Sequence, residues 1–450
     1  MTLTRDLVGE VAILANQQLD EHVASAARRT LLNALGTSIG ASKHGFVDAV
    51  VRTGIHEGGT PIAPVPGRIE RLDAHWAAIA TGLAAHIDDF DDTHLETMIH
   101  PGAAVLGAAL TVGVVRKSNG AEFLTAFALG CEVQLRLGRA MTPWHYDQGW
   151  HITGTCGVMG AATTAGLLVG LDSDKLSMAL GIAASQTLGI REAFGSAVKA
   201  FHPGKAAANG ILAASLAARG FTASDRILEA PRGYFNVLSP EHEPHRVLDG
   251  FGEQWELTQN TFKPYPCGIV SHPAIDAALA ARRHISDPSI IKSVTINCHP
   301  LVLELTNNPD PATGLEARFS TTHGAALGLL DGTVGLAQYE TARVRAPDAI
   351  SLRAKVRLHA TPKMPRDAAS IEIHLEDGSS VHEKVEHATG SLARPLDDLQ
   401  LKQKIHTLVE PVLAGRTERL VEAVSSLQEA SNLSLLESLI TPEGNGARQP

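Results

Sequence analysis

The chain has 450 residues, of which 44% are hydrophobic and 19% charged, values that describe a soluble globular protein long enough for more than one domain. Its net charge of −10 argues against nucleic acid as a partner, because phosphate binding needs a basic surface. No segment carries the roughly 18 uninterrupted apolar residues of a membrane span, and Asp6 and Glu10 stand where a signal peptide needs an apolar core, so we expect a cytoplasmic protein.

The first half of the chain has the periodicity of helices. Apolar residues recur at intervals of three and four in residues 21–39, 75–85, 103–115, 121–141, 157–168, 174–185 and 205–219. Ser173 and Asp174 are candidate N-caps of the helix predicted over 174–185. The many small residues in these segments predict closely packed helices.

The pattern changes to that of strands near residue 265. Residues 289–297 are rich in β-branched side chains, and residues 354–360 and 369–375 alternate apolar with polar. The last of these segments enters an Asp377-Gly378 turn and returns through residues 381–385, which predicts a hairpin.

Helical periodicity returns over residues 397–408 and 416–424, and the last eight residues predict a loose tail. The predicted fold class is therefore mainly α with a smaller α+β domain. Residues 1–267 and 396–450 are expected to form a large helical domain, with a C-terminal part that returns to it. Residues 268–395 are expected to form the inserted α+β domain.

A dense group of acids and histidines follows the helix predicted over residues 75–85. It comprises Asp88, Asp89, Asp91, Asp92, His86, His94 and His100. Such charges are costly at the end of an apolar element unless they are paired, hydrated or used. Histidines beside carboxylates are suited to proton transfer, so we favour an acid–base or substrate-binding site. Two alternatives stay open: a D-D-x-x-D site that holds Mg²⁺ against a diphosphate, and a hydrated helix end without function.

Three further segments add cations and histidines. Arg191, Lys199, His202 and Lys205 lie in a predicted glycine-containing loop that leads into a helix, where an anion would be favoured. Lys263 lies in a segment stiffened by two prolines, at the predicted domain junction. His151 directly precedes a predicted helix rich in Ala and Gly. Their alternative interpretations are a solvated basic loop, a rigid hinge and a structural histidine.

The four cysteines, Cys131, Cys156, Cys267 and Cys298, are far apart and form no C-x-x-C pair. This spacing is not that of a cysteine zinc site or an iron–sulfur cluster, so each cysteine is expected to be a small core residue. We expect an enzyme that uses no metal and no cofactor.

Taken together, these segments resemble the MmgE/PrpD family, which includes 2-methylcitrate dehydratases, cis-aconitate decarboxylases and an iminodisuccinate epimerase. The resemblance rests on residues 89–93 (DFDDT) followed by His100-Pro101, on 149–151 (GWH), 199–207 (KAFHPGKAA), 262–267 (FKPYPC), 316–320 (EARFS), 330–332 (LDG) and 390–395 (GSLARP). It implies a helical domain plus a smaller α+β domain, usually in a homodimer, with the active site between the two domains.

Carried over by position, the resemblance implies an active site of Asp89, Thr93, His100, His151, Lys199 and Lys263. We assign Asp89, His100 and His151 to catalysis, and Thr93, Lys199, His202 and Lys263 to substrate binding. These types suit the removal of a proton beside a carboxylate, which needs a base and fixed cations around the developing negative charge. His94 stands where typical 2-methylcitrate dehydratases and the animal type of decarboxylase have Trp, which predicts a reshaped pocket.

The sequence therefore predicts a metal-independent lyase that abstracts an α-proton from a small di- or tricarboxylate. A dehydratase of the 2-methylcitrate type is favoured. The alternatives are an epimerase or isomerase of a dicarboxylate and a decarboxylase of the cis-aconitate type. From other classes, a carboxylate-binding protein without activity and the Mg²⁺-dependent diphosphate enzyme remain to be tested.

Overall fold

The computed structural model describes residues 2–443, and its internal contacts divide the chain into two compact units. The helical unit contains the chain up to Ile87, residues Asp91–Asn260, and the described residues from Gln400 onward. The second unit contains Asp88–Phe90 and Thr261–Leu399. The sequence placed the junctions after residues 267 and 395. Most of the predicted tail, residues 444–450, lies outside the described part of the chain.

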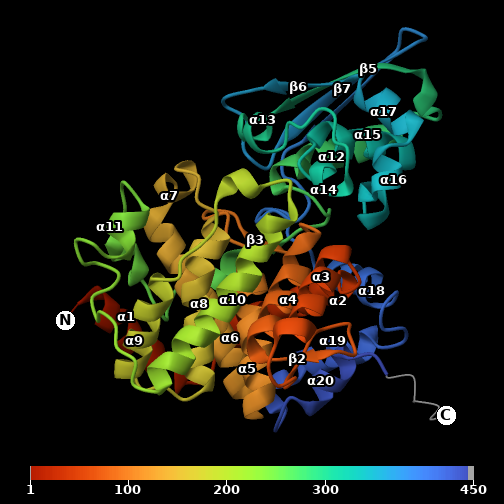
Figure 1. Ribbon diagram of the computed structural model, residues 1–450. Coiled ribbons are helices and arrows are strands. Elements are labelled where there is room, and N and C mark those ends of the chain that lie inside the picture. The colour runs from red at the N-terminus through yellow and green to blue at the C-terminus, as the bar shows by residue number, and fades with distance from the viewer. Residues whose placement is uncertain (1, 444–450) are drawn as a thin grey trace, which may run out of the picture. The chain divides into compact units, whose positions relative to one another are not determined.

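Among the described residues, the helical unit has fourteen of the α-helices and three short strands. They are coloured from red to green and in blue in Figure 1. Its helices are α1 (Leu3–Ala15), α2 (Glu21–Gly40), α3 (Gly45–Glu57), α4 (Ala74–Ile87), α5 (Pro101–Arg116), α6 (Gly120–Met141), α7 (Trp144–Asp147), α8 (Ile152–Leu168), α9 (Ser173–Ala184), α10 (Ala197–Ala218), α11 (Tyr234–Leu238), α18 (Asp398–Val409), α19 (Thr417–Ser425) and α20 (Ser434–Ile440). Its strands are β1 (Ala63–Pro64), β2 (Arg71–Leu72) and β3 (Asp92–His94), and β4 (Asn260–Phe262) begins at the last residue of the segment.

Close packing of α10 against α4 and α8 forms the centre of this unit. Gly204 on α10 meets Gly82 on α4 so closely that a Cβ on Gly204 would lie 2.4 Å from the carbonyl oxygen of Ile79. Only glycine fits there without moving a helix. The prediction that small residues bring these helices together is thus confirmed at this crossing.

Helix α10 begins earlier than predicted. The sequence placed Lys199 and His202 in a loop before a helix starting at residue 205, because Pro203 and Gly204 disfavour helix. The structure has α10 starting at Ala197, with Pro203 inside it. Pro203 removes the backbone N–H that would bond to the carbonyl of Lys199, and burial of most of the helix against its neighbours outweighs this loss. A second correction concerns α9, whose N-cap is Asp172, with Oδ1 accepting from the backbone N–H of Lys175.

The second unit contains a four-stranded sheet in the order β6-β5-β7-β8. Its strands are β5 (Ile291–Cys298), β6 (Val356–Ala360), β7 (Ala369–Leu375) and β8 (Ser380–Val385). Strands β5 and β6 are parallel, whereas β7 is antiparallel to β5 and to β8. The helices of this unit are α12 (His272–Arg282), α13 (Leu301–Leu305), α14 (Gly314–Ala317), α15 (Thr321–Asp331), α16 (Thr341–Val344) and α17 (Pro347–Arg353).

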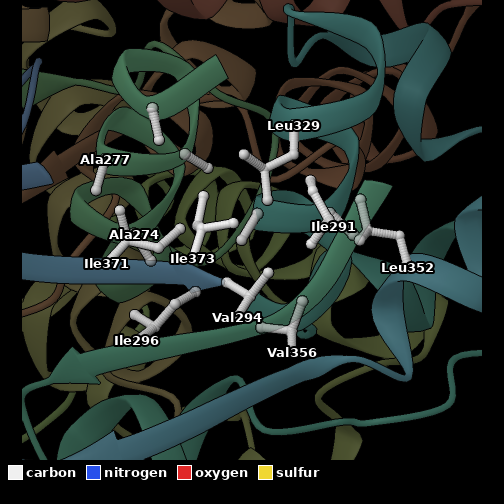
Figure 2. Close-up of a cluster of buried hydrophobic side chains, with 14 of the residues drawn as sticks. Ala274, Ala277, Ile291, Val294, Ile296, Leu329, Leu352, Val356, Ile371 and Ile373 are labelled. Carbon is white, nitrogen blue, oxygen red and sulfur yellow. The ribbon is translucent and has the colours of Figure 1, made fainter. Parts of the chain in front are cut away.

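One face of this sheet forms the core of the second unit. Val294, Ile296, Ile371 and Ile373 point from the strands toward Ala274 and Ala277 of α12 (Figure 2), and all are buried. The alternation predicted for residues 369–375 is therefore the alternation of a half-buried strand. Gly378 closes the predicted hairpin with φ +88°, a conformation that favours glycine. These elements confirm the predicted fold class.

Two further features of the described residues concern apolar helices and thiols. None of the helices in residues 2–443 is both long and apolar enough to cross a bilayer. The four cysteines are all buried, and none of them forms a disulfide.

Candidate active site

Asp91 and Asp92 follow α4 and bind different partners within the helical unit. Asp91 Oδ2 lies 2.5 Å from His86 Nδ1, and both side chains are completely buried. A carboxylate oxygen accepts from an imidazole N–H, so Asp91 holds the proton of His86 on Nδ1. Asp92 Oδ2 accepts from the backbone N–H of Gly102 at 2.9 Å and from Asn260 Nδ2 at 2.8 Å. Asp92 thereby secures the first turn of α5, where a helix favours negative charge.

Asp88 and Asp89 bind cations within the second unit. Arg318 Nη2 donates to Asp88 Oδ1 at 2.7 Å, and Lys263 Nζ donates to Asp89 Oδ1 at 3.0 Å and to the Asp89 carbonyl at 3.1 Å. Asp89 has φ +49°, which few residues other than glycine adopt, although Asp does so more readily than most. Each of the four carboxylates of the acidic run therefore has partners of its own.

His100 is the N-cap residue of α5, and its hydrogen bonds define its tautomer. Nδ1 lies 2.7 Å from the carbonyl oxygen of Asp92 and 3.1 Å from Thr93 Oγ1. A carbonyl oxygen can only accept, so Nδ1 carries the proton. Neutral His100 therefore has its lone pair on Nε2, the form in which an imidazole acts as a base.

His151 is the N-cap residue of α8 and contacts a second histidine on α10. Its Nδ1 lies 2.9 Å from His202 Nδ1, and the exposed fractions of the two residues are 2% and 5%. The ring of Phe194 meets the His151 ring edge-on, with 5.1 Å between the centroids. The backbone N–H of His151 donates to the Gly189 carbonyl, and its carbonyl accepts from the N–H of Gly154, which fixes the turn that carries His151.

His86 connects the two histidine sites. Its ring centroid lies 4.8 Å from that of His100 and 5.7 Å from that of His151, to which it is nearly parallel. Four imidazoles and the Asp91 carboxylate thus form one continuous buried group within the helical unit. We call His86, Asp91, His100, His151 and His202 the histidine cluster.

The electrostatics of the cluster keep two of its imidazoles neutral. Burial lowers the pKa of His151 well below 6.5, and the neighbouring His86 and Lys199 lower it further. Burial, again with His86 and Lys199, lowers the pKa of His202 to about 4. Asp92 has the opposite shift, because burial and the nearby Asp91 raise its pKa to about 7. Near neutral pH, the imidazole of His151 is therefore neutral.

Lys199 provides the cation of the cluster. It lies in the first turn of α10, its exposed fraction is 6%, and its Nζ lies 5.6 Å from the centroid of the Phe194 ring. A buried ammonium beside neutral imidazoles favours an anionic ligand. The other cations of this segment have different contacts: Arg191 stacks on the ring of Tyr146, and Lys205 Nζ donates to Asn209 Oδ1.

A divalent cation also fits the donor types of the cluster. Ligand atoms of His86, Asp91 and His100 lie within 4.8 Å of one another. Nδ1 of each of these histidines already contacts an oxygen, so coordination at that atom would displace an existing hydrogen bond. The sequence expectation of an enzyme without metal therefore needs a direct test.

Comparison with known proteins identifies the family of this chain. The MmgE/PrpD N-terminal domain matches residues 5–247, and the MmgE/PrpD C-terminal domain matches residues 265–429. The chain belongs to the MmgE/PrpD family. The two matched segments cover nearly all of the helical unit's first part and the second unit, so the resemblance inferred from short motifs is confirmed.

The curated relatives of this MmgE/PrpD protein include three cis-aconitate decarboxylases. The mouse enzyme is 28% identical across 98% of this chain and 93% of its own length. The human enzyme is 29% identical across 94% of this chain and 91% of its own length. The enzyme of Aspergillus terreus is 26% identical across 84% of each chain. These relatives are lyases, as the sequence predicted, and they release CO2 where the favoured prediction was loss of water.

The predicted site residues of this family member fall into two groups. Thr93, His100, His151, Lys199 and His202 lie in the helical unit, and the last four of them belong to or adjoin the histidine cluster. Asp89 and Lys263 form an ion pair in the second unit. The substrate-binding assignment of His202 does not account for its contact with His151 Nδ1.

Sequence reasoning missed His86 and Asp91 as members of the cluster. Both stood in the acidic run, but nothing in their spacing indicated which carboxylate would meet which imidazole. A histidine in the last turn of an otherwise apolar helix was the available signal, because a buried imidazole needs a partner.

His94, the position where some relatives have Trp, takes part in a polar network. Its Nδ1 lies 3.0 Å from Thr97 Oγ1 and its Nε2 lies 3.2 Å from Glu256 Oε2. Burial alone would raise the pKa of Glu256, but the hydrogen bond with His94 and the charge of Arg139 lower it overall. His94 therefore anchors the loop between β3 and α5 to the rest of the helical unit.

Proposed function

We propose that this protein is a lyase that removes CO2 from an unsaturated tricarboxylate of the cis-aconitate class. The observation that carries the proposal is the histidine cluster with its buried ammonium, in a chain similar to cis-aconitate decarboxylases over most of its length. The similarity favours decarboxylation over the dehydration that the sequence pattern favoured.

The reaction needs three contributions from the protein. The C–C bond to one carboxylate breaks, CO2 leaves, and the electron pair of that bond stays on the remaining carbon skeleton. The resulting carbanion is delocalised toward the remaining carboxylates, and a proton then adds to carbon. Fixed cations must hold the carboxylates, the developing negative charge must be stabilised, and an acid must supply the proton.

We assign carboxylate binding to Lys199, Lys263 and Thr93. A buried ammonium makes charge-assisted hydrogen bonds to carboxylate, and a hydroxyl adds a neutral one. Asp89, assigned to catalysis from the sequence, lies 3.0 Å from Lys263 Nζ, so we propose that it fixes the position of that ammonium.

We assign proton transfer to His151 and His100. In the ligand-free protein His151 is neutral, because burial and neighbouring cations lower its pKa. A bound tricarboxylate brings negative charge next to the imidazole, which favours the protonated form and raises its pKa. His151 would thus gain a proton as substrate binds and deliver it to the carbanion. His100, with Nε2 presented as a base, would complete the exchange of protons with solvent.

The reaction type can be tested with purified protein. Incubation with cis-aconitate in D2O, followed by NMR, should give CO2 and a five-carbon dicarboxylate carrying one solvent deuterium. A parallel incubation with 2-methylcitrate tests dehydration, and one with iminodisuccinate tests epimerisation. Loss of water from 2-methylcitrate without any CO2 release from cis-aconitate would overturn the proposal in favour of the hydro-lyase.

Two controls address the remaining alternatives. Full activity after treatment with EDTA is expected if the histidine cluster transfers protons without a metal, and lost activity that Mg²⁺ or Zn²⁺ restores would contradict this. Tight binding of cis-aconitate without deuterium incorporation or product would indicate a carboxylate-binding protein. The homodimer implied by the resemblance stays a prediction.

A further inference from the structure

We propose that His202 is a positioning residue that sets the tautomer of His151, and that it does not bind substrate. The inference rests on the proposed function, in which His151 transfers a proton. It goes beyond that function because it explains how a neutral imidazole can be held ready in one of two chemically different forms.

The inference rests on a contact between the Nδ1 atoms of two imidazoles. His151 Nδ1 and His202 Nδ1 lie 2.9 Å apart, a distance that requires one proton between them. If both nitrogens carried a proton, two N–H groups would repel, and if neither did, two lone pairs would face each other. One histidine must therefore donate and the other accept.

The two possible arrangements give His151 opposite properties. If His151 donates, its own Nε2 carries the lone pair and acts as a base. If His202 donates, His151 carries its proton on Nε2 and cannot accept one there. Protonated His151 has N–H at both nitrogens, so it needs His202 as the acceptor. Proton transfer through His151 therefore requires the tautomer of His202 that accepts at Nδ1.

The backbone holds the pair in contact. A Cβ on Gly154 would lie 3.1 Å from the Cβ of His202, and a Cβ on Gly189 would lie 3.3 Å from the Cβ of His151. The φ of Gly189 is +122°, which side-chain-bearing residues rarely adopt. These two glycines let the chain approach both histidines closely.

The groups around the pair come from several elements. His86 on α4, with Asp91 behind it, stacks on His151. His100 at the start of α5 and Lys199 on α10 face His151 as positive or potentially positive groups and disfavour its protonation. His202 is the neighbour whose nitrogen makes a direct hydrogen bond to His151, and so it is the one that can determine where the proton resides.

Two amide variants of the full-length protein separate positioning from binding. In His202→Asn the amide reaches about the place of Nδ1 and can accept from His151, whereas in His202→Gln it reaches about the place of Nε2. We expect His202→Gln to lower kcat by about tenfold to a hundredfold, as loss of an orienting partner does, with KM changed less than about threefold. His202→Asn should retain most of kcat.

The outcomes discriminate between the roles. A raised KM with unchanged kcat in both variants would overturn the inference and restore the substrate-binding role. Equal kcat loss in both variants would also overturn it, since Asn should rescue. As a readout independent of turnover, ¹⁵N NMR of histidine-labelled protein should show His151 with its proton on Nδ1, and His202→Gln should change that pattern. This signal is measurable even if the protein does not decarboxylate cis-aconitate, so the two proposals can fail separately.

Discussion

The two units of this protein bury charge in contrasting ways. In the helical unit, four imidazoles and one carboxylate lie together, and burial lowers the pKa of His151 and of His202, which keeps both imidazoles neutral near pH 7. In the second unit, Asp89 pairs with Lys263 and Asp88 pairs with Arg318, so each buried acid has a cation beside it. The comparison teaches that buried polar groups are accommodated in two ways: imidazoles by remaining neutral, and carboxylates by pairing with cations.

The largest effect on activity is expected from removing the imidazole of His151. His151→Ala should lower kcat by about 10²–10⁴-fold, the usual contribution of a general acid or base, while KM changes little. Steady-state kinetics on cis-aconitate measures this, with His22→Asn on the exposed start of α2 as a matched histidine control. A change in KM alone would reassign His151 to binding.

Breaking the ion pair between Lys263 and Asp89 should instead lower the stability of the fold. Lys263→Met leaves the Asp89 carboxylate without its nearest cation in a buried place, which should lower the free energy of unfolding by roughly 3–5 kcal/mol. The double variant Asp89→Asn, Lys263→Met should recover much of that loss, because no uncompensated charge is left. Chemical denaturation of the wild type, both single variants and the double variant tests this. If the losses in the free energy of unfolding were strictly additive, the ion pair would not be the source of the lost stability.

Lys199 allows the anion preference of the histidine cluster to be measured. Citrate at a hundredfold excess over its Kd should stabilise the native state by about 2.7 kcal/mol, and acetate at equal ionic strength should not. In Lys199→Met the protection at the same citrate concentration should shrink, since a charge-assisted hydrogen bond contributes roughly 1.5–3 kcal/mol. Thermal unfolding reports both effects. Equal protection by acetate would point to a neutral or monoanionic substrate.

Expressed per pH unit, the smallest effect is the net dependence of stability on pH. Burial lowers the pKa of His145 and of His202 to about 4, below the unfolded value of about 6.5. As pH falls from about 6.5 to 4, the unfolded chain gains protons that the folded chain does not, so each histidine lowers the free energy of unfolding by up to about 1.4 kcal/mol per pH unit. Asp92 acts in the opposite direction, since its raised pKa of about 7 favours the folded state on acidification.

The measurement is urea denaturation at several pH values. Two histidines outweigh one carboxyl, so stability should decrease on acidification, and His145→Gln should reduce the slope. His145 is suited to this test because its nitrogens contact the Leu238 carbonyl and Thr155 Oγ1, which indicates a structural role. If stability rose as pH fell through this range, the lowered pKa values of His145 and His202 would be contradicted.

The sequence by itself determined most of the secondary structure and the residue types of the site. Periodicity placed α5, α6 and the β7–β8 hairpin because each depends on local alternation and on a turn such as Asp377-Gly378. The motifs around Asp89, His100, His151, Lys199 and Lys263 indicated the family because their residue types and order are local properties of the chain.

Tertiary structure decided the remaining features, which depend on contacts between distant segments. It placed Pro203 inside α10, where packing against α4 and α8 outweighs an intrinsic preference for a helix break. It also paired Asp91 with His86 and Asp89 with Lys263, although the two acids are separated by one residue. Partners are selected by which side chains meet at bonding distance after the helices pack, and neither spacing nor composition contains that distance.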